Sequence, residues 1–292
     1  MCDEHTELSN EEHFKAGDLS RRGFTVMSAA ALAACATSPE NAKTVVEREV
    51  TIASADGTID AHYAAPSSGK YPAVLVWPDI MGLRPAFRRM GVRLAESGYA
   101  VLTVNPFYRS KAGAVIAEGE SFSQPEVRSR LIPLMQAATS NPENTKKDAT
   151  AAIAWLDQQK EVDTKKGVGT TGYCMGGPLV MRTMAFAPDR VRAGGSFHGG
   201  GLATTQPTSP HLLVPQMKAK AVLIAVAEND DKQDPTVKDK VRDAFAASNI
   251  PAEIEVYPAQ HGWCPPDSQV FDQVQADRAW ARLLATFEKG LV

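Results

Sequence analysis

The sequence has little of several features that mark particular classes of protein. Its 292 residues include four cysteines, too few and too widely spaced for a disulfide scaffold or a four-cysteine zinc ribbon. Lys and Arg number 31 against 34 Asp and Glu, so the basic excess needed to bind nucleic acid is missing. No apolar run reaches the roughly 20 residues that cross a bilayer, so we expect no integral membrane span.

What is present is enough apolar material for a folded core. Apolar residues make up 43% of the chain and charged residues 22%, a balance that excludes wholesale disorder. The length fits one large α/β domain or two small ones. We find no internal repeat and no linker long enough to divide the chain, and therefore predict one domain over residues 40–292.

The first 36 residues differ in composition from the rest. They hold six acidic and three basic residues, which accounts for the whole net charge of −3. Arg21-Arg22 precedes a short, Ala-rich run, an order typical of a twin-arginine export signal. We therefore predict a signal peptide over residues 1–36, cleaved after Ala34-Cys35-Ala36, and a periplasmic protein. The same ending also fits a lipid anchor at Cys35, and a cytoplasmic protein with an Ala-rich N-terminal helix is the alternative.

Alternating patterns predict the fold of the remainder. Two stretches of alternating apolar and polar residues flank Asp56-Gly57 and predict a hairpin over residues 45–64. The further predicted strands are 73–77, 99–104, 167–171, 193–197, 221–227 and 252–257. The predicted helices are 85–97, 141–159, 174–187, 236–248 and 269–287. Strands that alternate with helices in this way predict a mostly parallel sheet covered on both faces.

A candidate nucleophile lies between a predicted strand and a predicted helix. Gly172-Tyr173-Cys174-Met175-Gly176-Gly177 has the G-x-nucleophile-x-G form of a nucleophile elbow, with Cys where Ser is commoner. Glycines allow strand and helix to pass close to each other at a sharp turn. The turn also points a helix N-terminus at the thiol, which favours the thiolate. A buried structural cysteine in a Gly-rich turn is the alternative.

An acid and a histidine follow in the order that an elbow hydrolase requires. Asp230 and Asp231 come after strand 221–227, and His261 comes after strand 252–257. Both positions are carboxyl ends of strands, where open α/β sheets place their sites. We expect His261 to hold the Cys174 thiolate in an ion pair or to act as the base for the thiol. An aspartate would orient the imidazole of His261, with Asp230 preferred to Asp231. His198, which ends another strand, lines the pocket or is structural.

These motifs resemble the dienelactone hydrolase family (carboxymethylenebutenolidases) of the α/β-hydrolase superfamily, over residues 47–290. The resemblance rests on the cysteine elbow, on the loops of Asp230 and His261, and on the segment Trp77–Gly82. It implies an α/β-hydrolase fold without a large cap domain, and a Cys–His–Asp triad that needs no metal or organic cofactor.

The resemblance also implies roles for residues around the triad. The backbone N–H groups of Met175 and Ile80 would form an oxyanion hole. Asp79 stands where the family usually has Glu, and would modulate the thiol. Family arginines bind the carboxylate of the substrate. Arg128 or Arg130 would take that part here. Tyr173, His198 and Trp263 are the other possible pocket residues.

The resulting hypothesis is a hydrolase of a small-molecule lactone or carboxylic ester that works through a thioester acyl-enzyme. The first alternative is a carboxylesterase of the same fold with broader specificity, since a fold does not fix a substrate. The second is a non-catalytic exported binding or redox protein, in which a disulfide between Cys174 and Cys264 silences the thiol. The sequence leaves the oligomeric state open, and a monomer is compatible with it.

Overall fold

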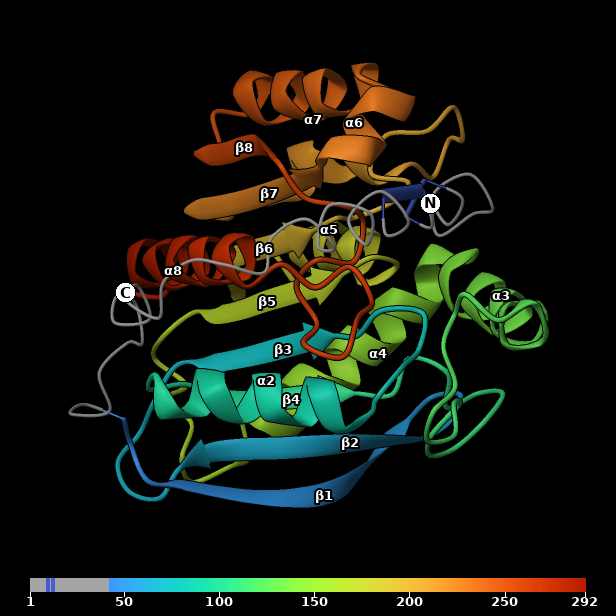
Figure 1. Cartoon of the computed structure of the whole chain (residues 1–292). Coiled ribbons are helices and arrows are strands. Elements are labelled where there is room, and N and C mark those ends of the chain that lie inside the picture. Colours follow the sequence, from blue (N-terminus) through green and yellow to red (C-terminus); the bar gives the residue numbers. More distant parts are fainter. Residues whose placement is uncertain (1–8, 11, 14–41) are drawn as a thin grey trace, which may run out of the picture.

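An eight-stranded sheet forms the centre of the molecule within residues 42–292 (Figure 1). The computed structural model describes that range together with residues 9–10 and 12–13, so most of the predicted signal peptide lies outside the described residues. The strands are β1 (Val45–Ser54), β2 (Gly57–Pro66), β3 (Ala73–Trp77), β4 (Ala100–Val104), β5 (Val168–Tyr173), β6 (Val191–Phe197), β7 (Ala221–Ala227) and β8 (Ala252–Tyr257).

The strand order across the sheet is β1-β2-β4-β3-β5-β6-β7-β8. β1 and β2 form the predicted antiparallel hairpin, in which Ser54 pairs with Gly57 beside the turn. β2 joins β4 antiparallel, and from β4 to β8 all neighbouring strands run parallel. The mostly parallel sheet and the N-terminal hairpin predicted from the sequence are thus confirmed.

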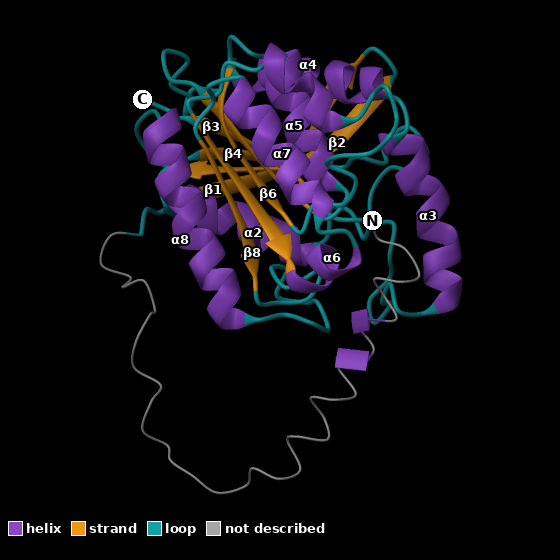
Figure 2. Cartoon of the chain, turned by 90° about the horizontal axis from the view of Figure 1, so that it is seen from above, coloured by secondary structure: helices purple, strands orange, loops and turns teal. Residues whose placement is uncertain are grey.

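Helices cover both faces of the sheet (Figure 2). They are α2 (Pro85–Glu96), α3 (Pro125–Thr139), α4 (Pro142–Leu156), α5 (Gly176–Phe186), α6 (Glu228–Gln233), α7 (Thr236–Ala247) and α8 (Gln273–Gly290), with a 3-10 helix at Pro210–Gln216. One apolar cluster contains Phe87 of α2 and Phe287 of α8. The other contains Ile153 of α4 and Val180 of α5. Because helices pack on both faces, the central strands β3, β4 and β5 are buried at every residue.

Two helices were not predicted from the sequence. α3 buries only Val127 and Leu131 and contains Pro133, so its apolar face is too weak to stand out as a helical pattern. α6 is six polar residues long and begins directly after β7. The cap predicted for the helix at 142 is present, because the Asn141 side chain accepts the Glu143 N–H. None of the helices in the described part of the chain has both the length and the apolar character that crossing a membrane demands.

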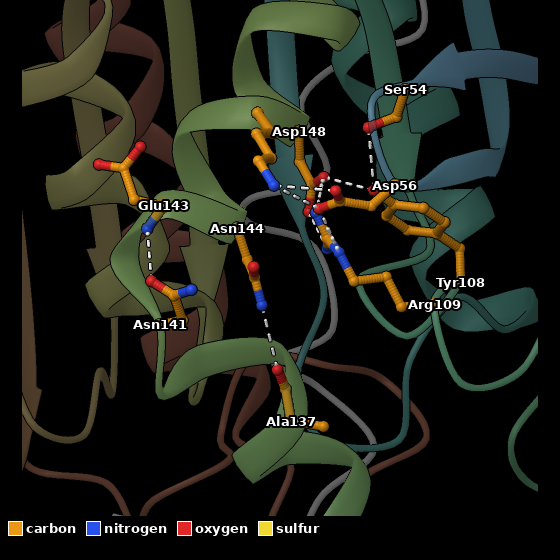
Figure 3. A network of polar contacts seen from close by, with 10 residues as sticks. Ser54, Asp56, Tyr108, Arg109, Ala137, Asn141, Glu143, Asn144 and Asp148 are labelled. Atoms are coloured by element: carbon orange, nitrogen blue, oxygen red, sulfur yellow. Dashed lines mark hydrogen bonds and ion pairs between the residues drawn. The ribbon is translucent and has the colours of Figure 1, made fainter.

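A polar network around the buried Asp148 ties the hairpin turn to α4 (Figure 3). The Arg109 guanidinium donates to both carboxylate oxygens of Asp148 on α4, at 2.7 and 2.8 Å, and also to Asp56 in the turn. Tyr108 donates to the same Asp148 at 2.7 Å, and Lys147 pairs with Asp56. The Asp148 side chain is only 7% exposed, so its charge depends on Arg109 for compensation.

We therefore expect Arg109→Met to destabilise the fold by about 2–3 kcal/mol, since it leaves a buried carboxylate with one neutral donor. Lys147→Met is the matched control in the same network. The Lys147 side chain is 42% exposed and pairs with Asp56 alone, so we expect less than about 1 kcal/mol. Urea denaturation at pH 7 measures both, and equal losses for the two variants would contradict this account.

Candidate active site

The elbow predicted around Cys174 is formed as a sharp turn between β5 and α5. Cys174 has a φ of 55°, a left-handed conformation that is rare for residues other than glycine. A Cβ at Gly172 would collide with the Gly176 carbonyl, and a Cβ at Gly176 would collide with the Trp77 carbonyl of β3. These two positions therefore require glycine, and the close crossing carries Cys174 beyond the end of β5.

His261 and Asp230 form a direct contact in the loops after β8 and β7. Nδ1 of His261 lies 2.7 Å from Oδ2 of Asp230, and the His261 N–H donates to Oδ1 of Asn229 at 2.8 Å. Asp231, the other candidate acid, pairs instead with Lys238 at 2.6 Å. α6 produces this division, because consecutive helical residues point in different directions. The geometry thus joins Asp230, and not Asp231, to His261.

A cavity of about 950 Å³ lies at the carboxyl ends of the strands. It is lined by one residue from each of the segments that follow β3, β5, β6 and β8, namely Ile80, Cys174, His198 and His261. Cys174, His198 and His261 are each at most 5% exposed. Four separate segments of the sequence therefore bring the Cys174 side chain, two imidazoles and a backbone loop to one cavity, the kind of place where small-molecule sites occur.

Asp79 is held by an arginine in the wall of this cavity. Nη1 and Nη2 of Arg84 contact the two oxygens of Asp79 at 2.6 and 3.0 Å, and the Met81 N–H donates to one of them. Arg84 also binds Asp267 at 2.7 and 2.9 Å. Burial opposes the charge on Arg84, but the two carboxylates outweigh burial and raise its pKa. In this structure Asp79 is therefore ion-paired with Arg84.

Several other residues predicted for the pocket lie elsewhere. Arg130 projects from α3 and binds Glu120, and neither it nor Arg128 lines the cavity. Tyr173 and Trp263 are buried and belong to the apolar cluster behind the site, with Tyr173 lining a smaller cavity. α3 was not recognised in the sequence, so the direction of its arginines could not be judged.

The arginines at the cavity come instead from α2 and the loop before it. Arg84, Arg88 and Arg89 line the cavity. Arg88 pairs with Glu49 at 2.7 Å, whereas Arg89 is exposed and has no carboxylate partner in the described part of the chain. One feature of the sequence could have indicated these cavity arginines. It is the pair Arg88-Arg89, on a predicted helix that starts just after the Trp77–Gly82 segment.

The two cysteines in the described residues are in different states. Cys174 is disulfide-bonded, whereas Cys264 is a free, buried thiol. The disulfide between Cys174 and Cys264 that the sequence allowed is therefore not formed. Burial raises the pKa of the Cys264 thiol, which keeps it protonated and unreactive. Cys174 must be reduced before its sulfur can act as a nucleophile.

A residue near the start of the sequence also contacts the site. Nδ2 of Asn10 donates to the His261 carbonyl at 2.9 Å, and Oδ1 of Asn10 accepts from Nδ2 of Asn229 at 3.2 Å. Asn10 is among the residues that line the cavity. No local pattern in the sequence signals this contact, because 251 residues separate Asn10 from His261.

The sheet topology, the cysteine elbow and the His261–Asp230 contact form an arrangement typical of the α/β-hydrolase class. The model of the dienelactone hydrolase family matches residues 59–291, and the chain belongs to that family. The chain is 26% identical over 284 residues to a Methylorubrum extorquens protein named "Putative carboxymethylenebutenolidase", with 93% of each chain covered. It is 23% identical over 233 residues to the carboxymethylenebutenolidase of Pseudomonas sp. strain P51, covering 80% of this chain and 91% of that one.

Solved structures share the same fold. A dienelactone hydrolase-like promiscuous phosphotriesterase, P91 from metagenomic libraries, superposes with a TM-score of 0.70 at 20% identity. The match covers 85% of this chain and 99% of that one. At this level of identity the likeness supports the fold alone. The α/β-hydrolase architecture expected from the sequence is therefore confirmed.

The ion pairs of Arg84 predict a large stability effect. Arg84→Leu would leave Asp79, which is 6% exposed, as an uncompensated buried charge, and we expect a loss of about 3–5 kcal/mol. Arg88→Leu serves as the control, because its partner Glu49 has a side chain that is 61% exposed, and we expect less than about 1 kcal/mol. Guanidinium denaturation followed by fluorescence compares them. A change of under 1 kcal/mol for both would show that Asp79 does not need Arg84.

Proposed function

We propose that this chain hydrolyses a lactone or carboxylic ester through a Cys174–His261–Asp230 triad. The observation that carries the proposal is the 2.7 Å contact between His261 Nδ1 and Asp230, in a cavity that His261 shares with the elbow cysteine. An aspartate at Nδ1 fixes the tautomer that presents Nε2 to a nucleophile, and it stabilises the imidazolium. The helix N-terminus beyond Cys174 favours the thiolate.

The proposed reaction has two steps. The Cys174 thiolate attacks the carbonyl carbon, the bond to the leaving alkoxide breaks, and the His261 imidazolium gives its proton to that alkoxide. His261 then takes a proton from water as the water attacks the thioester. The acid is released and the thiolate is restored.

The oxyanion would be stabilised by the backbone N–H groups of Met175 and Ile80. Met175 immediately precedes α5, and Ile80 lies in the loop after β3, which are the two places from which such donors come. Neither amide donates to an acceptor within the described residues. For Asp79 to modulate the thiol, as the family resemblance implies, its carboxylate would have to exchange Arg84 for Cys174.

The triad is tested on reduced protein with matched aspartate variants. We expect Cys174→Ala to abolish turnover of p-nitrophenyl acetate, and Asp230→Asn to lower kcat by about a hundredfold or more. Asp231→Asn is the control and should keep kcat within about twofold, since Asp231 pairs with Lys238 and not with His261. Wild-type protein should gain activity on reduction of the Cys174 disulfide. Full activity in Cys174→Ala would contradict the proposal.

The substrate class separates a dienelactone-like enzyme from the broader carboxylesterase. Arg89 is the cavity arginine without a carboxylate partner among the described residues, so we propose that it binds a carboxylate of the substrate. Arg89→Ala should then raise KM about tenfold for a carboxylate-bearing lactone and leave KM for the neutral p-nitrophenyl acetate unchanged. Equal effects on both substrates, or no preference of the wild type for the anionic one, would favour the carboxylesterase.

We further propose that residues 1–36 form the twin-arginine signal and that the domain over residues 40–292 works in the periplasm. Cleavage after Ala36, together with reduction of the Cys174 disulfide, would remove Asn10 from the cavity and thereby open the site to substrate. N-terminal sequencing of protein from cell fractions tests this. A full-length chain confined to the cytoplasm would contradict it, and a lipidated N-terminus at Cys35 would favour the anchored form. A binding or redox protein without catalysis would show no turnover in either form.

A further inference from the structure

Two side chains outside the proposed triad hold the backbone amides of its cysteine and its histidine. The Cys174 N–H points to Nδ1 of His198 at 3.1 Å, and the His261 N–H donates to Oδ1 of Asn229 at 2.8 Å. His198 is fully buried and Asn229 is 9% exposed. The reaction described above gives neither side chain a task, although each contacts a reacting residue.

His198 is kept in one protonation state. Nδ1 accepts a hydrogen bond from Cys174, so the ring proton resides on Nε2. Burial, and secondarily the nearby His261, holds the pKa of His198 well below its usual value. The ring is therefore neutral and an acceptor at neutral pH. The backbone of His198 is held as well: its φ is 40°, and its N–H donates to the Ala225 carbonyl of β7 at 2.8 Å.

The same imidazole contacts the proposed base. The ring centroids of His198 and His261 are 5.1 Å apart in an edge-to-face arrangement, and Trp263 packs against His198 in the same way at 4.9 Å. The Cys174 N–H is shared with the Phe197 carbonyl, which lies at 3.0 Å. His198 is thus the one side chain described here that bridges the elbow amide and the ring of His261.

Asn229 completes the arrangement from the other side. It precedes Asp230 at the start of α6, so consecutive residues hold the backbone and the ring of His261. Reacting groups need to be held within about half an ångström of the productive geometry, and a displacement of 1 Å can cost about a hundredfold in rate. Fixing both amides limits the movement of the thiolate and the imidazole relative to each other.

We propose that His198 and Asn229 are positioning residues that set the separation and orientation of Cys174 Sγ and the His261 ring. This inference rests on the proposed function. Removal of either acceptor should disturb the ion pair proposed between the Cys174 thiolate and the His261 imidazolium. His198 lines the cavity, so its replacement is chosen to keep the side-chain volume and with it the shape of the cavity. The consequence is a loss in kcat and in thiolate content, with KM unchanged.

The experiment uses the reduced full chain and two variants at each position. His198→Phe and Asn229→Leu remove the acceptor at similar volume, whereas His198→Asn and Asn229→Asp keep an acceptor oxygen. We expect the first pair to lower kcat on p-nitrophenyl acetate about tenfold at unchanged KM. The same pair should slow iodoacetamide alkylation of Cys174 about tenfold at pH 6 and move the midpoint of its pH profile upward. The second pair should stay within about threefold of wild type.

Thermal unfolding of each variant separates positioning from folding. Folded His198→Phe and Asn229→Leu proteins with wild-type kcat and a wild-type alkylation profile would overturn the inference. The inference would also be overturned if kcat fell in all four variants in proportion to their melting temperatures. The variants that keep an acceptor oxygen would then have preserved no activity. The proposed function, and the inference with it, would be overturned by two results together. These are no selective alkylation of Cys174 in the wild-type protein and full turnover by Cys174→Ala.

Discussion

The close crossing of β5 and α5 against β3 is the constraint on which the rest of the site depends. Only glycine at positions 172 and 176 lets the Gly176 carbonyl approach β5 and the Trp77 carbonyl approach the start of α5. At this crossing Cys174 adopts a left-handed conformation and lines the cavity. The strain at this turn is balanced by a core packed on both faces of the sheet.

Buried charges then fix the loops around that turn. Arg84, just before α2, binds Asp79 in the loop after β3 and Asp267 in the loop that follows His261. One guanidinium therefore holds the proposed oxyanion loop and the histidine loop to each other. Arg84 and Asp79 are both buried, so their contact is stronger than it would be in water and the loss of one partner is costly. Arg109 likewise holds the turn of the β1–β2 hairpin, at one edge of the sheet, to Asp148 of α4.

The parts of the fold that the sequence predicted are those with a local signal. Continuous apolar runs mark β3 and β7, Asp56-Gly57 marks the hairpin turn, and Asn141-Pro142 marks the start of α4. α3 escaped prediction because only two of its side chains are buried. The ion pair between Arg84 and Asp267 joins residues 183 positions apart, and Asn10 reaches His261 across 251, so only the tertiary fold brings them together.

The candidate site divides in the same way. The order of Cys174, the aspartates and His261 follows from the elbow motif, and the contact with Asp230 follows from how α6 turns away from β7. The supporting residues His198 and Asn229 carry no motif of their own, since their role depends on which amide they face. The sequence did not distinguish the cavity arginines from Arg128 and Arg130, because it carries no clear helical pattern for α3.

The central claim is that the reduced thiol of Cys174 carries the acyl group during hydrolysis. Intact-mass spectrometry of the reduced His261→Ala variant, mixed with an activated ester, tests this most directly. Without the histidine to activate water, an acylated protein should accumulate, and peptide mapping should place one acyl group on Cys174. The account is contradicted if no adduct forms, or if the acyl group is found on another residue, while the wild type turns over the same ester.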